Sequence, residues 1–145
     1  MNIDLVNLGI VHGGAELIVP HEFFSYRSLD SLEAVESDSG KALIRFGVFG
    51  LSVSVYLDQD SQEVLYGLNP GDVNIVNTSF PHFTQCVLRL SEMFPFYAED
   101  SDADEWEEAA QRVEDVIREI DPSAYREGSF WYEFRWDVTT GDFHD

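Results

Sequence analysis

The sequence is poor in the residues that disulfides and nucleic-acid binding require. Cys86 is the only cysteine among 145 residues, which excludes an intramolecular disulfide. Eight residues are Lys or Arg and 28 are Asp or Glu, which gives a formal net charge of -20. Because binding to a phosphate backbone depends on cationic side chains, this balance argues against nucleic acid and anionic lipid as partners. It favours a basic partner, although solubility alone is an equally good reason for the charge.

The chain also lacks targeting and membrane-spanning patterns. Its first five residues contain no basic stretch and include Asp4, so they do not resemble a signal peptide. No uninterrupted apolar run reaches the roughly 18 residues that a membrane helix needs. The length favours one domain over residues 1–145, and 44% hydrophobic residues suffice for a core. We therefore expect a single-domain cytoplasmic protein.

Motifs for catalysis and cofactor binding are missing as well. The sequence has no Gly-x-Ser-x-Gly elbow, no phosphate-binding Gly-Lys-Ser or Gly-Lys-Thr loop and no dinucleotide fingerprint. The alternating aspartates at 100–104 resemble the start of a calcium loop, but Glu105 and Gln111 stand where that loop needs Gly and Glu. Cys86 falls on the apolar face of a predicted helix, where a buried core thiol is the simpler interpretation. We predict no catalytic residue, metal or cofactor.

The middle of the chain predicts a sheet. Alternation over 51–58 places Leu51, Val53, Val55 and Leu57 on one face, as a half-buried strand requires. The short polar turn at 59–62, in which the aspartates bond their own backbone, predicts antiparallel pairing of the strands on either side. Residues 1–20 are expected to cover a sheet edge in short extended segments, and 28–41 to form a loop. Strands are expected at 42–47, 51–58, 63–67 and 73–76.

Two helices are predicted from apolar residues three and four positions apart. The first begins near Thr78 and places Phe83, Cys86, Val87, Leu90 and Phe94 on one apolar face. The second runs from Asp104 to the stop at Asp121–Pro122, with capping-box spacing between Asp102 and Glu105. Residues 77–79 are expected to be a structural junction between strand and helix. The predicted fold class is α+β, with a mixed, mainly antiparallel sheet and helices packed against it.

The tail and the acidic block are the remaining features. Strict alternation over 130–138 predicts a strand, whereas a helix there would group Phe130, Phe134 and Val138. Seven of the ten residues at 99–108 are acidic. They form either a solvated helix start or a docking patch for a basic protein. These candidate partner-binding residues, called the acidic block below, are Glu99, Asp100, Asp102, Asp104, Glu105, Glu107 and Glu108.

The order of elements resembles the SUKH superfamily of immunity proteins, and specifically its group-four branch. The more particular matches are Val-Asn-Thr-Ser at 76–79 and Asp121–Pro122 ahead of Trp131. The resemblance also covers 8–10, 44–58, 63–64, Phe83, Leu90, Ile120 and Ala124. It implies one α+β domain, no catalytic residues and a helix after Trp131, which conflicts with the alternation described above.

What the resemblance implies about function is neutralisation of a toxin from competing bacteria, encoded by a neighbouring gene. The toxin is often a nuclease or nucleic-acid deaminase, and such enzymes are basic near their sites, which suits an acidic partner. The alternative is a non-enzymatic domain that binds a small ligand in a pocket lined by Phe and Trp. Toxin identity, contact surface and oligomeric state are left open by the sequence.

Overall fold

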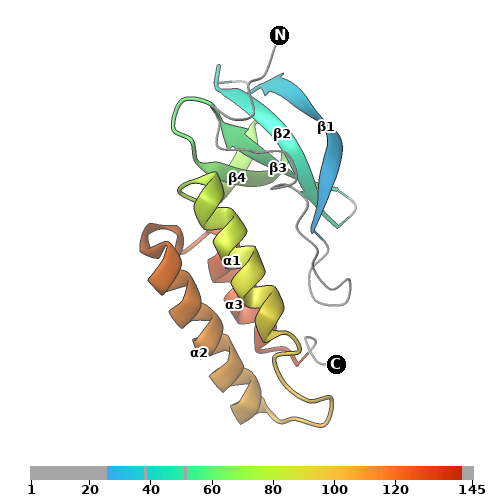
Figure 1. Cartoon of the computed structure of the whole chain (residues 1–145), viewed down its shortest axis with the longest axis vertical. Helices are drawn as coiled ribbons and strands as arrows, with labels where there is room; N and C mark the ends of the chain where they lie inside the picture. Colours follow the sequence, from blue (N-terminus) through green and yellow to red (C-terminus); the bar gives the residue numbers. More distant parts are fainter. Residues whose placement is uncertain (1–25, 38, 51, 142–145) are drawn as a thin grey trace.

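A computed structural model describes residues 26–37, 39–50 and 52–141 of the chain (Figure 1). The predictions for residues 1–20 and for Leu51 lie outside these residues. Figure 1 shows the sheet at one end of the molecule and the helices gathered at the other. The elements are β1 (Tyr26–Glu36), β2 (Ala42–Phe49), β3 (Val53–Asp58), β4 (Val64–Asn69), β5 (Asp72–Asn77), α1 (Phe80–Met93), α2 (Ala103–Ile120), the 3-10 turn η1 (Pro122–Ala124) and α3 (Phe130–Val138).

The sheet is a meander in which the strands pair in sequence order, from β1 to β5. All four pairings are antiparallel. The turn after β3 closes with a hydrogen bond of 2.9 Å from the Asp58 amide to the Glu63 carbonyl. The Asp58 carboxylate accepts from the Asp60 amide at 2.9 Å, as predicted for a turn residue. The α+β class is thus confirmed, with antiparallel strands throughout the described sheet.

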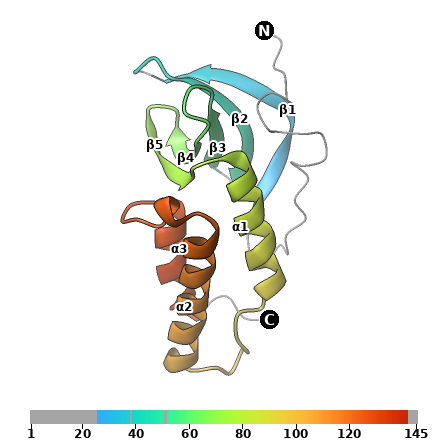
Figure 2. The same ribbon diagram turned by 60° about the vertical axis from the view of Figure 1, so that its left-hand side comes forward.

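Both faces of the central strands are buried. Val55 and Leu57 are fully buried in the main core, and Val53 packs against it, as the alternation predicts. The opposite face forms a second buried cluster that includes Tyr56 and Leu65. The main core is continuous from the sheet into all three helices. Figure 2 shows α2 and α3 lying along each other, with α1 beside them.

The predicted loop at 28–41 is wrong, because most of it belongs to β1. The register between β1 and β2 shifts between Ser28 and Glu33. A shift of this kind breaks the two-residue period, so Leu29, Leu32 and Val35 are spaced by three although they lie on a strand. Only the end of the predicted loop forms the connection, where the Gly40 amide donates to the Ser37 carbonyl at 2.9 Å.

The two predicted helices are confirmed, and they begin within two residues of the expected starts, at Phe80 and Ala103. Ser79 caps α1 by accepting from the His82 amide at 3.2 Å, with a proline in the first turn. Asp102 caps α2 by accepting from the Glu105 amide at 3.0 Å. The predicted apolar face of α1 is buried, and α2 ends at Asp121 as predicted.

The predicted strand at 130–138 is wrong, because these residues form α3. Ser129 caps the helix by accepting from the Tyr132 amide at 3.3 Å. Trp131, Phe134 and Val138 then share the buried side of the helix, at the spacing of three and four that a helix requires. The alternation misleads because six of the nine residues are aromatic or aliphatic, so an apolar residue occurs at every second position by composition alone.

Candidate functional site

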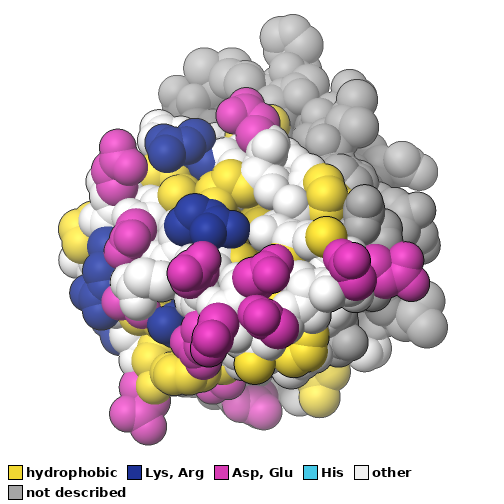
Figure 3. Space-filling model, turned by 90° about the horizontal axis from the view of Figure 1, so that it is seen from below, with side chains coloured by type: hydrophobic (Ala, Val, Ile, Leu, Met, Phe, Trp, Pro, Cys, Tyr) yellow, Lys and Arg dark blue, Asp and Glu magenta, His cyan; other side chains and the backbone are white. Residues whose placement is uncertain are grey.

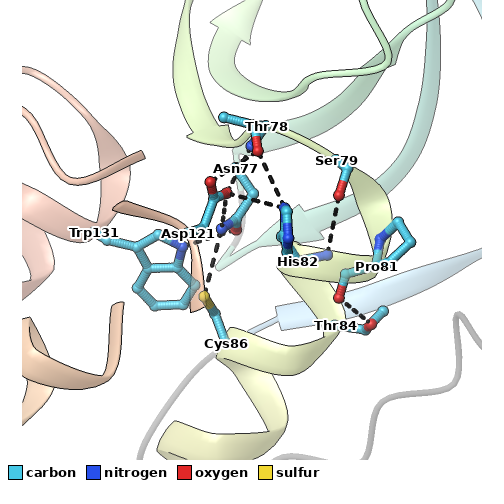
Figure 4. A network of polar contacts seen from close by, with 9 residues as sticks. All are labelled: Asn77, Thr78, Ser79, Pro81, His82, Thr84, Cys86, Asp121 and Trp131. Carbon is cyan, nitrogen blue, oxygen red and sulfur yellow. Dashed lines mark hydrogen bonds and ion pairs between the residues drawn. The ribbon is translucent and has the colours of Figure 1, made fainter. Parts of the chain in front are cut away.

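A buried polar junction lies where β5, α1, α2 and α3 meet (Figure 4). At its centre is Asn77, which is fully buried. The Asn77 amide donates to Asp121 Oδ2 at 3.0 Å and to Cys86 Sγ at 3.4 Å. The Asn77 carbonyl oxygen accepts from Trp131 Nε1 at 2.9 Å. One side chain therefore contacts all three helices from the end of the sheet.

Asp121 fixes the start of α1 to the end of α2. Its side chain accepts from the Thr78 amide at 2.8 Å and from the Thr78 hydroxyl at 2.8 Å. His82 Nδ1 lies 3.1 Å from that hydroxyl and 3.8 Å from Asp121 Oδ2. Because each carboxylate oxygen of Asp121 receives a donor, the junction serves to hold the fold, as the sequence predicts for residues 77–79.

Cys86 lies in the same junction and is protected from reaction. It is fully buried, and burial raises the pKa of its thiol to about 12 despite the hydrogen bond from Asn77. The thiolate is the nucleophilic and metal-binding form of cysteine, so Cys86 is a neutral core residue near neutral pH. This agrees with its predicted place on the apolar face of α1.

The described residues meet few of the requirements of a small-molecule pocket or a metal site. A surface hollow of about 360 Å³ lies beside the turn between β1 and β2, and none of the described residues that line it is aromatic. In the described part of the chain, no three His, Cys, Asp or Glu side chains are arranged to hold a metal ion. None of the described helices is long and apolar enough to span a membrane. Among the described aromatic residues, Trp131, Phe46 and Phe83 are fully buried in the core.

The acidic block lies at the far end of the helices from the sheet. Glu99 and Asp100 are in the turn before α2, and the others cap or occupy its first two turns. All seven side chains are exposed. Figure 3 views the molecule from this end and shows Asp and Glu side chains gathered over it. The structure therefore brings the seven predicted residues together on one surface.

Two residues of the acidic block have a role within the chain. Asp102 caps α2, as described above. Glu107 Oε2 lies 3.5 Å from Arg135 Nη1 on α3. Among the described residues, the other five carboxylates form no ion pair within 4 Å. The acidic block thus combines a structural part with five uncompensated charges.

The spacing of these five carboxylates is unfavourable for the helix itself. Asp104 and Glu108 are four residues apart, and like charges at that spacing destabilise a helix by about 0.2–0.5 kcal/mol. The positive end of the helix dipole offsets part of this cost for Asp104 and Glu105, which lie in the first turn. Glu108 lies beyond the first turn and gains less. The charge density therefore exceeds what stabilising α2 requires.

Further along α2, acidic side chains are paired with cations. Arg118 Nε donates to Glu114 Oε2 at 2.8 Å, an ion pair between residues four apart on the helix. Burial opposes ionisation of Glu114, but hydrogen bonds from Arg118, Tyr125 and Arg135 outweigh it and lower its pKa. Burial and the Glu114 carboxylate raise the pKa of Tyr125 to about 12. Instead of pairing with Glu108, Arg112 donates to the Phe96 carbonyl at 3.2 Å.

Arg135 and Trp136 were not predicted as site residues. Arg135 joins α3 to α2 through Glu107, Gln111 and Glu114, and Trp136 is exposed beside it. The only signal in the sequence is the arginine itself, placed between Phe134 and Trp136. Assigning 130–138 to a strand concealed which residues face α2.

This arrangement defines an α+β scaffold with a buried polar junction and an exposed acidic end. A family model described as SUKH-4 immunity protein matches residues 20–137, which is most of the chain. The chain therefore belongs to the SUKH-4 immunity protein family. No curated protein and no solved structure matches the chain significantly.

Proposed function

We propose that this chain is a non-enzymatic immunity protein that binds a basic bacterial toxin and neutralises it by direct contact. The family match carries the immunity role. The whole chain, residues 1–145, is proposed to form one domain that acts in the cytoplasm. A nuclease or nucleic-acid deaminase is the proposed class of toxin, because such enzymes present basic surfaces to their substrates and a surface of opposite charge complements them.

The acidic block is the proposed contact surface. Its support is the group of five exposed carboxylates without a cationic partner among the described residues, on a chain of net charge -20. Such a field attracts a basic partner and speeds its association. Unpaired like charges cost the free protein stability, so their concentration at one end of α2 is easier to explain by a partner than by the fold.

Co-expression with the toxin encoded by the adjacent gene tests the immunity role. The chain should restore growth of cells that make the toxin, and the purified proteins should form a complex. Growth arrest that persists with the soluble chain present, together with no complex, would contradict the proposal.

Charge reversal tests the proposed surface. Changing Asp104, Glu105 and Glu108 to Lys should slow association with the toxin by about tenfold at low salt. The matched control changes Glu36, Asp60 and Asp72 to Lys, which are exposed at the sheet end of the molecule. Both variants change the charge by +6 (three times +2). An equal effect of the two on the association rate would show that net charge matters and the acidic block does not.

A further inference from the structure

Trp136 on α3 exposes an unusual amount of apolar surface. Its exposed fraction is 46%, and among the described residues the only other large hydrophobic side chains with comparable exposure are Leu68 and Leu88. Leu68 belongs to β4 and Leu88 to α1. The exposed part of a tryptophan gains no burial from the fold, and Trp is enriched among residues that dominate protein–protein binding energy.

The Trp136 side chain is held in place by its neighbours. The guanidinium carbon of Arg135 lies 4.3 Å from the centroid of the indole ring. The Tyr132 ring packs edge-on against the indole, with 6.4 Å between the ring centroids. Arg135 is itself fixed, because Nε lies 3.3 Å from Glu114 Oε1 and Nη2 lies 3.4 Å from Gln111 Oε1. A side chain ordered before binding loses little conformational entropy when a partner covers it.

Trp136 adjoins the acidic block through Arg135. The guanidinium that stacks on the indole also lies 3.5 Å from Glu107, a member of the block. The turn after α3 packs on the first turns of α2, since a Cβ at Gly141 would meet the Trp106 ring at 2.6 Å. Figure 3 shows hydrophobic side chains exposed beside Asp and Glu at this end. The indole is therefore linked to the acidic block through the ion pair between Arg135 and Glu107.

Arg135 also carries a hydrogen-bond donor for which the described residues supply no acceptor. The side chain is only 8% exposed, and its buried Nη1 atom has no hydrogen-bond partner in the part of the chain that the structure describes. This Nη1 atom forms an ion pair with Glu107 Oε2 at 3.5 Å, and the Glu107 side chain is 57% exposed. A partner that covered Glu107 would confine its carboxylate against this donor. Leaving such a donor unsatisfied is costly, so binding here would gain a charge-assisted hydrogen bond.

We infer that Trp136 is the apolar anchor of the surface that binds the toxin, with the acidic block as its charged rim. The inference rests on the proposed function and deepens it. A basic protein surface is the occupant that fits, because its cations complement the carboxylates and can lie on the free part of the indole. A second copy of this chain would bring two surfaces of the same negative charge together, and nucleic acid would be repelled. An anchor inside a polar rim is the usual arrangement of binding hot spots.

Substitution of Trp136 tests the inference in the complex with the toxin encoded by the adjacent gene. Trp136→Ala should raise Kd by about 30-fold, mainly through faster dissociation, and the loss should persist at high salt. Trp136→Phe should retain most of the affinity because it keeps an aromatic ring. Leu88→Ala, at a position 45% exposed on α1, is the matched control and should change Kd by less than about twofold. Thermal melting of each free variant, measured alongside, confirms that binding is compared between folded proteins.

Two results would overturn the inference in different ways. If the wild-type chain binds the toxin and Trp136→Ala has the same Kd as Leu88→Ala, the anchor is elsewhere and the proposed function stands. If the wild-type chain neither binds nor protects against the toxin, the proposed function fails together with the anchor that depends on it.

Discussion

The buried junction around Asn77 and the acidic block on α2 use polar side chains in opposite ways. At the junction, Asn77 and Asp121 are 0% and 2% exposed, and their side-chain oxygens and nitrogens have hydrogen-bond partners. In the acidic block, five exposed carboxylates have no cation within 4 Å among the described residues. The comparison suggests that the first group specifies the fold and that the second is available for a partner.

Arg135 lies between the two regions and shows that the chain can pair its charges where the fold needs them. Its guanidinium contacts Glu107 and Glu114 from one side of α2. Glu114 is also bonded to Arg118 and Tyr125. Because the chain has only eight basic residues for 28 acidic ones, one-to-one pairing within the chain leaves most carboxylates without a cationic partner. Charge left uncompensated at Asp104 and Glu108 is therefore informative about function.

The largest effect on stability is expected at Asp121. Asp121→Ala removes the acceptor of the Asn77 amide and of both Thr78 donors, leaving buried donors without partners. We expect the free energy of unfolding to fall by about 3 kcal/mol, measured by urea denaturation. The control Asp115→Ala, exposed on α2, should change it by less than about 0.5 kcal/mol. Equal losses at both positions would break the distinction between the junction and the surface.

Two tryptophans on α3 provide a matched comparison. Trp131 is fully buried and donates to Asn77, whereas Trp136 is 46% exposed. Trp131→Phe should lower the free energy of unfolding by about 2 kcal/mol, because it leaves a cavity and removes the N–H group that donates to the Asn77 carbonyl oxygen. Trp136→Phe should change it by less than about 0.5 kcal/mol. Calorimetry of the two variants checks this, and similar melting temperatures would contradict the assigned burial.

The sequence was sufficient for features set by local chemistry. Asp102 was recognisable as a cap, and the spacing of the apolar residues on α1 and α2 defined the buried faces. The Asp58 turn was predictable because its side chain bonds its own backbone. Each of these depends on residues within about four positions of one another, which a sequence shows directly.

The errors arose where distant contacts decide the structure. β1 was missed because pairing with β2 stabilises a strand whose own period is broken by a register shift. The alternation misassigned α3, where the family resemblance implied a helix, because Trp131 finds its hydrogen-bond partner in Asn77, 54 residues away, and Arg135 finds Glu114. The acidic block was predicted as a group, but its division into paired and unpaired carboxylates depends on Arg135. No local pattern encodes these contacts.

Glu114 should give the paired carboxylates a recognisable pH dependence. Its pKa is lowered in the fold from an ordinary value of 4.5, so the unfolded state binds the proton first as pH falls. The stabilisation is therefore complete above that value and is lost as pH falls through the folded pKa. Glu114→Gln should cost about 1 kcal/mol at neutral pH and little in acid, measured by urea denaturation against pH. Tyr125→Phe removes one hydrogen bond to Glu114 and should lower the free energy of unfolding by a smaller amount, with the same pH dependence. If either variant cost the same free energy at all pH values, this account would be contradicted.

The smallest effect on stability is expected at Glu108, where it tests whether the acidic block stabilises α2 or serves a partner. Glu108→Gln removes one of two like charges four residues apart, so the free energy of unfolding should rise by about 0.3 kcal/mol at low salt. Salt should abolish the gain because the charges are exposed. Glu119→Gln is the control, since Glu119 lies 3.6 Å from Arg89 and its loss should be neutral or slightly destabilising. If Glu108→Gln stabilises the free chain and also slows its association with the toxin, this carboxylate is retained at a cost to the fold. A loss of stability equal to that of Glu119→Gln would instead mean that the acidic block serves α2.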